Sequence, residues 1–132
     1  MLTSPKLVLA DAEKHNYAIA GFNFYNLDTL FAILEAAEEE LAPIILQLYS
    51  PYFSFLGTAA IAAAALTAIR NSPAKAALHL DHANEFQLIK QVLDNGFNSV
   101  MIDASHLPLK ENIEITLKVV KAAHNVGAFT EA

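Results

Sequence analysis

Short apolar runs alternate with helix-like patterns along the whole chain, and this alternation restricts the fold more than any other feature. Five runs read as strands, at residues 18–24, 44–49, 76–81, 100–103 and 128–132. Strands that are apolar at nearly every position are typical of a parallel sheet covered by helices, because both of their faces are buried. The repeat of about 25 to 30 residues fits β–α–β units. The sequence therefore predicts an α/β fold.

Helical spacing of apolar residues fills the segments between these strands. Asn26 can cap the helix that follows the first strand, and the acidic run at 38–40 should lie on the solvated face of that helix. Asn95 and Gly96 provide a C-terminal stop for another helix. The helices are expected at residues 3–16, from about 27 onward, from the alanine-rich stretch to Arg70, at 86–93 and at 111–124.

Two architectures compete for this pattern. One is an open, doubly wound sheet, and the other is part of a (β/α)₈ TIM barrel, which typically needs about 250 residues. No glycine-rich phosphate loop follows the first strand, so the dinucleotide-binding form of the open sheet is poorly supported. The chain of 132 residues holds four strand–helix units and the start of a fifth strand, which is about half of a barrel.

Composition excludes several classes of function. The net charge of −6 argues against a general nucleic-acid binder, which needs clustered Lys and Arg. The longest alanine-rich run, at 59–66, is too short to span a membrane, and no secretory signal is visible at the N-terminus. The absence of cysteine leaves His, Asp and Glu as metal ligands and is compatible with a reducing cytoplasm, where we expect the protein.

Polar residues gather where the predicted strands end. They are Asn23; Gln47, Tyr49 and Ser50; His79, Asp81 and His82; Asp103, Ser105 and His106; and Glu131. In parallel α/β folds, chemistry gathers at this carboxyl edge of the sheet. The sequence therefore predicts a functional site there.

The segment "ALHLDHANE", residues 77–85, is the most informative of these strand ends. Side chains alternate along a strand, so His79 and Asp81 should face the barrel interior while Leu78 and Leu80 face the helices. A neutral polar group buried without a partner costs about 2–7 kcal/mol, so these groups need partners. They form either a satisfied polar patch or part of a site for a divalent metal such as zinc; a lone strand-end histidine is more often structural.

Three segments together resemble one enzyme family. The segments "LHLDHANE", "GFNSVMIDASHLPLKENI" and "AFTEA" resemble the class II, metal-dependent fructose-bisphosphate and tagatose-bisphosphate aldolases, and "GFNFYNLDTLFAILEAAEEELAPIILQ" fits the first two units of that family. The resemblance runs from about residue 5 to the end. It implies that residues 1–132 form the N-terminal half of a single TIM-barrel domain.

The resemblance also implies roles for individual residues. Asp81 matches the catalytic residue that exchanges a proton with the aldehyde oxygen, and His82 matches a ligand of the catalytic Zn²⁺. Asp103 matches a ligand of a second metal position, whereas Asn23 and Ser50 are expected to bind substrate. The family is a lyase of carbohydrate metabolism and glycolysis. It cleaves a ketose 1,6-bisphosphate to dihydroxyacetone phosphate and glyceraldehyde 3-phosphate, usually as a homo-oligomer, here expected to be a dimer or tetramer.

The sequence departs from the family pattern at several positions. Ala83 stands where a glycine usually follows Asp-His, and Tyr49 begins a bulkier segment than the family's serine and small residues. The remaining zinc histidines of the family lie further along the barrel, so we expect this chain alone to be inactive. The alternative is a non-catalytic or divergent half-barrel that self-associates or acts on another sugar phosphate. Neither reading includes a nucleic-acid or membrane partner.

Overall fold

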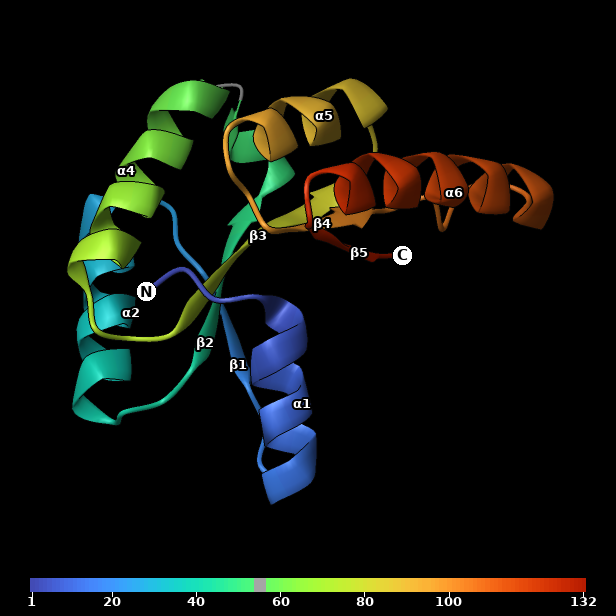
Figure 1. The fold of residues 1–132 in the computed structure, drawn as a ribbon. Helices are drawn as coiled ribbons and strands as arrows, with labels where there is room; N and C mark the ends of the chain where they lie inside the picture. The colour runs from blue at the N-terminus through green and yellow to red at the C-terminus, as the bar shows by residue number, and fades with distance from the viewer. Residues whose placement is uncertain (54–56) are drawn as a thin grey trace.

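The computed structural model describes residues 1–53 and 57–132, which form one parallel sheet with helices against it (Figure 1). The strands are β1 (Ala20–Asn23), β2 (Ile44–Tyr49), β3 (Ala76–Ala83), β4 (Ser99–Ile102) and β5 (Phe129–Glu131). The helices are α1 (Pro5–His15), α2 (Leu27–Glu39), the short 3₁₀ helix η1 (Ser50–Tyr52), α4 (Thr58–Asn71), α5 (Phe86–Asp94) and α6 (Leu109–Asn125).

The order of the strands decides between the two predicted architectures. All neighbours are parallel and follow chain order, β1-β2-β3-β4-β5. A doubly wound sheet reverses its order at a switch point, whereas a barrel adds each strand beside the last. The curved sheet, with α2, α4, α5 and α6 in a row outside it and α1 apart from that row, is therefore the arc of a barrel (Figure 1).

The core lies between the outer face of the sheet and this row of helices. Leucine, isoleucine and valine from the three central strands are at most 2% exposed there: Leu46, Leu48, Leu78, Leu80, Val100 and Ile102. They pack with apolar side chains from each covering helix, including Leu34, Ile69, Ile89 and Val119. Burying a side chain of this size contributes about 1.5–3 kcal/mol, so this layer holds the helices on the strands.

Helix boundaries follow local chemistry. The Asn26 side chain accepts a hydrogen bond from the Thr29 amide at 2.8 Å, and the Thr29 hydroxyl accepts one from the Asn26 amide at 3.2 Å, so the predicted cap of α2 is confirmed. Gly96 follows α5 with φ +96°, and an added Cβ would lie 2.9 Å from a Leu66 methyl group. The backbone conformation therefore requires glycine at this turn, and an added Cβ would also force Leu66 to shift.

Several predicted boundaries shift. Strand β3 continues two residues past Asp81, because a register change between Leu80 and Ala83 lets it keep pairing with β4. Helix α6 begins at Leu109 rather than 111, directly after Pro108, whose fixed φ favours a helix start. The 3₁₀ turn at Ser50–Tyr52 was not predicted.

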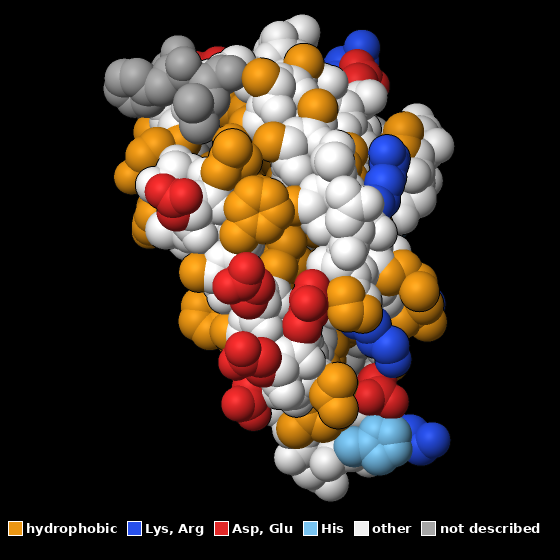
Figure 2. Space-filling model, turned by 90° about the vertical axis from the view of Figure 1, so that its left-hand side faces the viewer, with side chains coloured by type: hydrophobic (Ala, Val, Ile, Leu, Met, Phe, Trp, Pro, Cys, Tyr) orange, Lys and Arg blue, Asp and Glu red, His pale blue; other side chains and the backbone are white. Residues whose placement is uncertain are grey.

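The outer surface carries mixed side chains. On the side formed by α2 and α4, acidic groups lie beside exposed hydrophobic ones (Figure 2). Glu39 and Glu40 are exposed, as predicted for the acidic run, and Phe31 on the same helix is 49% exposed. Across residues 1–53 and 57–132, no helix combines the length and apolarity that a membrane crossing requires.

Candidate active site at the carboxyl edge of the sheet

The inner face of the sheet is polar near its carboxyl edge. The register places Asn23, Gln47, His79 and Ser99 side by side on four neighbouring strands. A Cβ on Gly21 would lie 2.9 Å from the Gln47 side-chain oxygen, so the backbone of β1 passes close to that amide. On β3, alternation therefore sends His79 and Asp81 inward and Leu78 and Leu80 toward the helices, as the sequence predicts.

Asp81 lies on this face beside a second predicted residue. Its carboxylate accepts a hydrogen bond of 3.1 Å from the side-chain amide of Asn23, and its side chain is 14% exposed. Because the two residues stand on β1 and β3, the bond spans β2. The structure thus brings Asp81 and Asn23 together and leaves the carboxylate accessible at the edge.

His82 occupies the tip of β3 in an unusual backbone conformation. Its φ is +51°, in the left-handed region that residues with a Cβ rarely adopt, and it falls inside the register change of β3. Its Nδ1 lies 2.9 Å from an Asp103 carboxylate oxygen, and its Nε2 lies 4.0 Å from an Asp81 oxygen. The imidazole therefore lies next to both predicted acidic residues, Asp81 and Asp103. The side chain is half exposed, so this group of three residues, called the corner below, is open to solvent.

Ser50 contacts the backbone of this corner. Its hydroxyl donates a 2.7 Å hydrogen bond to the His82 carbonyl oxygen. The bond connects η1 to the tip of β3 at the residue where the pairing of β3 with β4 is interrupted. Ser50 therefore lies in the site, where the sequence places it, and its observed partner is the main chain of a neighbouring strand.

The hydrogen bond between Asp103 and His82 shifts the pKa of both side chains. Hydrogen bonds from His82 and from the Ser105 hydroxyl and amide lower the pKa of Asp103 to about 2. The Asp103 hydrogen bond raises the pKa of His82. A carboxylate that stays ionised beside an imidazole is a common way to orient a histidine.

The described residues do not make up a complete metal shell. Imidazole and carboxylate groups are the donors that zinc accepts, and a catalytic zinc takes three protein ligands and keeps one open position. Within residues 1–53 and 57–132, however, no three His, Asp or Glu side chains are grouped so that they could hold an ion. His82 and Asp103 fit as members of such a shell, but they do not complete it.

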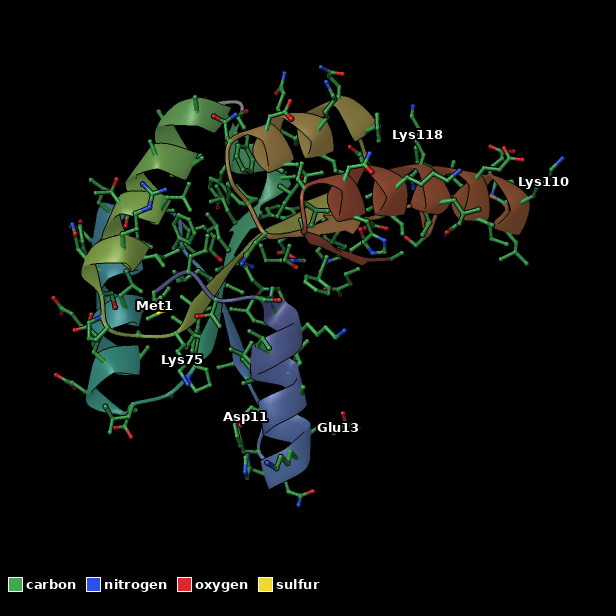
Figure 3. The ribbon with its side chains drawn as sticks, in the orientation of Figure 1. Met1, Asp11, Glu13, Lys75, Lys110 and Lys118 are labelled. Atoms are coloured by element: carbon green, nitrogen blue, oxygen red, sulfur yellow. The ribbon has the colours of Figure 1, made fainter. Side chains whose placement is uncertain are left out.

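A cavity of about 850 Å³ opens above the corner. Its wall includes Tyr49, His82, Asp103 and His106, and none of its described lining residues is Lys or Arg. Figure 3 shows Lys110 and Lys118 projecting from α6 away from the sheet. The part of the site on this chain therefore offers carboxylates, imidazoles and aromatic rings rather than cations.

An aromatic row extends away from this cavity, whose wall holds only Tyr49 and His82 of the row, and the sequence revealed the row only in part. The ring centroids of Tyr25 and Tyr52 lie 5.1 Å apart, those of Tyr52 and Tyr49 6.2 Å, and those of Tyr49 and His82 6.3 Å. Sequence reasoning singled out Tyr49 as bulky but missed Tyr25. Tyr25 lies two residues after Asn23 in the sequence, and this spacing is the signal that could have placed Tyr25 at the same edge of the sheet.

Comparison with known proteins gives one consistent family. The model of the class-II fructose-bisphosphate aldolases matches residues 3–132. The fructose-bisphosphate aldolase of Staphylococcus epidermidis is 44% identical over 134 aligned positions, covering 99% of this chain and 47% of that protein. The Helicobacter pylori enzyme of the same name is 40% identical, covering 100% of this chain and 43% of its own length.

Solved structures agree with this result. The YdjI aldolase from Escherichia coli superposes with a TM-score of 0.93 at 29% identity, over 100% of this chain and 50% of that one. A putative fructose-1,6-bisphosphate aldolase from Coccidioides immitis gives a TM-score of 0.90 at 32% identity, over 97% of this chain and 45% of that one. The chain thus spans about half the length of the proteins it matches. With the family model matched from residue 3 to residue 132, this chain belongs to the class-II fructose-bisphosphate aldolase family.

Proposed function

We propose that this chain is the N-terminal half of a single-domain class II aldolase. The whole protein would catalyse the reversible aldol cleavage of a ketose 1,6-bisphosphate, fructose or tagatose, to dihydroxyacetone phosphate and glyceraldehyde 3-phosphate. One observation carries the proposal. The Asp81 carboxylate, held by Asn23, lies 4.0 Å from the His82 imidazole at the carboxyl edge of the sheet, the edge where enzymes with this barrel place their active sites.

Each predicted residue has a defined role in this reaction. A Zn²⁺ ion held in part by His82 would supply Lewis acidity to the ketose carbonyl. Asp81 takes the proton of the C4 hydroxyl as the C3–C4 bond breaks, and the electron pair of that bond stays on C3 of the three-carbon fragment, which takes up a proton from solvent to give dihydroxyacetone phosphate. In the condensation direction Asp81 returns its proton to the aldehyde oxygen. Asn23 keeps the carboxylate in place.

The other two residues support this arrangement. Asp103 orients the imidazole of His82 and serves a second metal position. Ser50 anchors the main chain of His82 and lies in the wall of the cavity beside His82 and Asp103, where its hydroxyl oxygen can still accept a hydrogen bond. Protonated imidazole cannot bind a metal, so an ion at this corner must displace the His82 proton that Asp103 favours.

The test has two parts, one for binding and one for activity. We expect Co²⁺, a spectroscopic substitute for Zn²⁺, to bind the chain weakly through His82, and His82→Ala to abolish the binding. His124→Ala on the exposed end of α6 is the matched control and should leave it unchanged. Equal binding by both variants would contradict the proposal.

Activity provides the second readout. Because one imidazole cannot complete a catalytic zinc shell, the purified chain with added Zn²⁺ should show no cleavage of fructose 1,6-bisphosphate or tagatose 1,6-bisphosphate. The corresponding whole-length protein should cleave one of them and should lose activity in Asp81→Asn. Cytoplasmic glycolysis is part of this proposal, and fractionation of source cells would test the location.

A second candidate function is self-association of the half-barrel. In the described part of the chain, β1 and β5 each pair with a strand on one side only, and Phe22 on β1 is 49% exposed. Unpaired strand edges and exposed aromatic groups favour assembly into a homodimer or tetramer. Sedimentation velocity should then show an oligomer that Phe22→Lys shifts toward monomer, and a monomer in both proteins would exclude this candidate.

A further inference from the structure

His79 is a buried residue of the inner face that the proposed reaction does not use. Its side chain is 3% exposed, and its Nδ1 lies 2.7 Å from the Ser99 hydroxyl oxygen. Its Nε2 has no hydrogen-bond partner among the described residues, although an oxygen of Glu131 lies 3.6 Å away. A buried polar atom left unpaired costs about 1–3 kcal/mol, so this nitrogen requires an explanation.

The surroundings of the ring select one tautomer. Burial lowers the pKa of His79, so the imidazole is neutral near pH 7 and carries a single N–H. The Ser99 hydroxyl can donate to Nδ1, which leaves the hydrogen on Nε2. The opposite tautomer would aim the Nε2 lone pair at a carboxylate, which is repulsive.

Glu131 is the group that this N–H faces. Its side chain is 63% exposed and stands on β5, a strand of only three residues, so packing alone does not fix its direction. Its charge acts on His82 as well as on His79. The carboxylate therefore lies 3.6 Å from the buried histidine and within electrostatic reach of His82.

We infer that His79 is a positioning residue. Ser99 fixes its ring, and its Nε2–H holds the Glu131 carboxylate within electrostatic reach of His82. This arrangement adds a negative charge where a cation would bind. The cation part of the inference rests on the proposed function, whereas the contact between His79 and Glu131 does not.

Nitrogen NMR of the chain tests the contact directly. At pH 7 the ¹⁵N spectrum should show His79 with hydrogen on Nε2 and a bare Nδ1, and Glu131→Gln should shift the Nε2 signal. Ser99→Ala should shift the Nδ1 signal, while the exposed His15 on α1 stays unchanged in both variants. Hydrogen on Nδ1, or a Nε2 signal insensitive to Glu131→Gln, would overturn the inference.

A matched pair of substitutions tests the consequence for metal binding. Gln at position 79 places an amide near the Nε2 site, and Asn places one near the Nδ1 site. Outer-shell partners typically contribute about 10- to 100-fold to metal affinity. We expect His79→Asn and Glu131→Gln to weaken Co²⁺ binding by about tenfold, at the low end of that range, and His79→Gln to retain most of the affinity.

Equal loss in His79→Gln and His79→Asn, or no loss in Glu131→Gln, would contradict the positioning role. Circular dichroism of each variant separates these outcomes from misfolding. If the unsubstituted chain bound no Co²⁺, the proposed function would fail together with the cation part of this inference. The NMR tautomer would then decide the contact alone.

Discussion

The two faces of β3 serve different purposes: the outer face contributes to the stability of the fold, and the inner face carries the polar groups of the candidate site. Leu78 and Leu80 point outward and are fully buried among the helices. His79 and Asp81 point inward and contact side chains on β4 and β1, respectively. Residues that are adjacent in the chain thus meet opposite environments, because alternation is built into a strand. We expect changes on the outer face to unfold the protein and changes on the inner face to alter proton and ion binding.

Removing an outer side chain should have the largest effect. Leu80→Ala leaves a cavity in the core and should lower the free energy of unfolding by about 2–5 kcal/mol, measured by urea denaturation. Gln47→Ala on the inner face is the control and should cost less than about 1 kcal/mol, since Gln47 is only half-buried. Similar losses in the two variants would contradict the division between the faces.

The second effect is a pH dependence from the inner face. Burial lowers the pKa of His79 in the folded chain, so between that value and the unfolded pKa of about 6.5 the unfolded state binds an extra proton. Stability from the neutral ring is present above pH 6.5 and is lost as the pH falls toward the folded pKa. His79→Gln should flatten this acid limb of the unfolding free energy, and an unchanged limb would refute the assignment.

A smaller effect is expected at the strand tip. Ser50→Ala removes the hydrogen bond to the His82 carbonyl and should cost about 0.5–1.5 kcal/mol, with shifted NMR signals for His82. Ser4 precedes α1 without a side-chain cap bond, so Ser4→Ala is the matched control and should leave both readouts near those of the unsubstituted protein.

The smallest effect should come from Gly21. In Gly21→Ala the added Cβ would approach the flexible end of the Gln47 side chain, which can move aside. Alanine also reduces the conformational entropy of the unfolded chain, which raises the free energy of unfolding by about 0.4–1 kcal/mol. The two contributions nearly cancel, so thermal unfolding should change little. In a Gln47→Ala background the same substitution should become stabilising, and a destabilising result there would show that the backbone itself is strained.

The fold was predictable from the sequence because its signals are local and repeated. Apolar runs set the strands, and capping residues such as Asn26 set helix starts. The strand pattern alone left the choice between barrel and open sheet unresolved; the family resemblance implied the barrel, and the strand order, which is a tertiary property, confirms it. The 3₁₀ turn after β2 escaped prediction because Ser50 and Pro51 also suit an ordinary turn.

The residues that make up the site could be predicted from the sequence better than the contacts between them. Asn23, Asp81, His82 and Asp103 converge as strand-end reasoning requires. Sequence alone could not reveal the partner of Ser50, because that bond depends on the register change at His82. The contact of His79 with Ser99 joins residues twenty positions apart and likewise needed the pairing of β3 with β4.

The left-handed backbone at His82 has a consequence for anyone who transplants this corner to a designed scaffold. Copying the imidazole onto a regular strand would send it to the face opposite Asp81, because successive side chains alternate, whereas here a residue with positive φ brings its ring to Asp103. Asparagine or glycine would tolerate the bend but lack the nitrogen ligand, and valine or isoleucine would resist it. A graft must therefore reproduce the kink first and the histidine second.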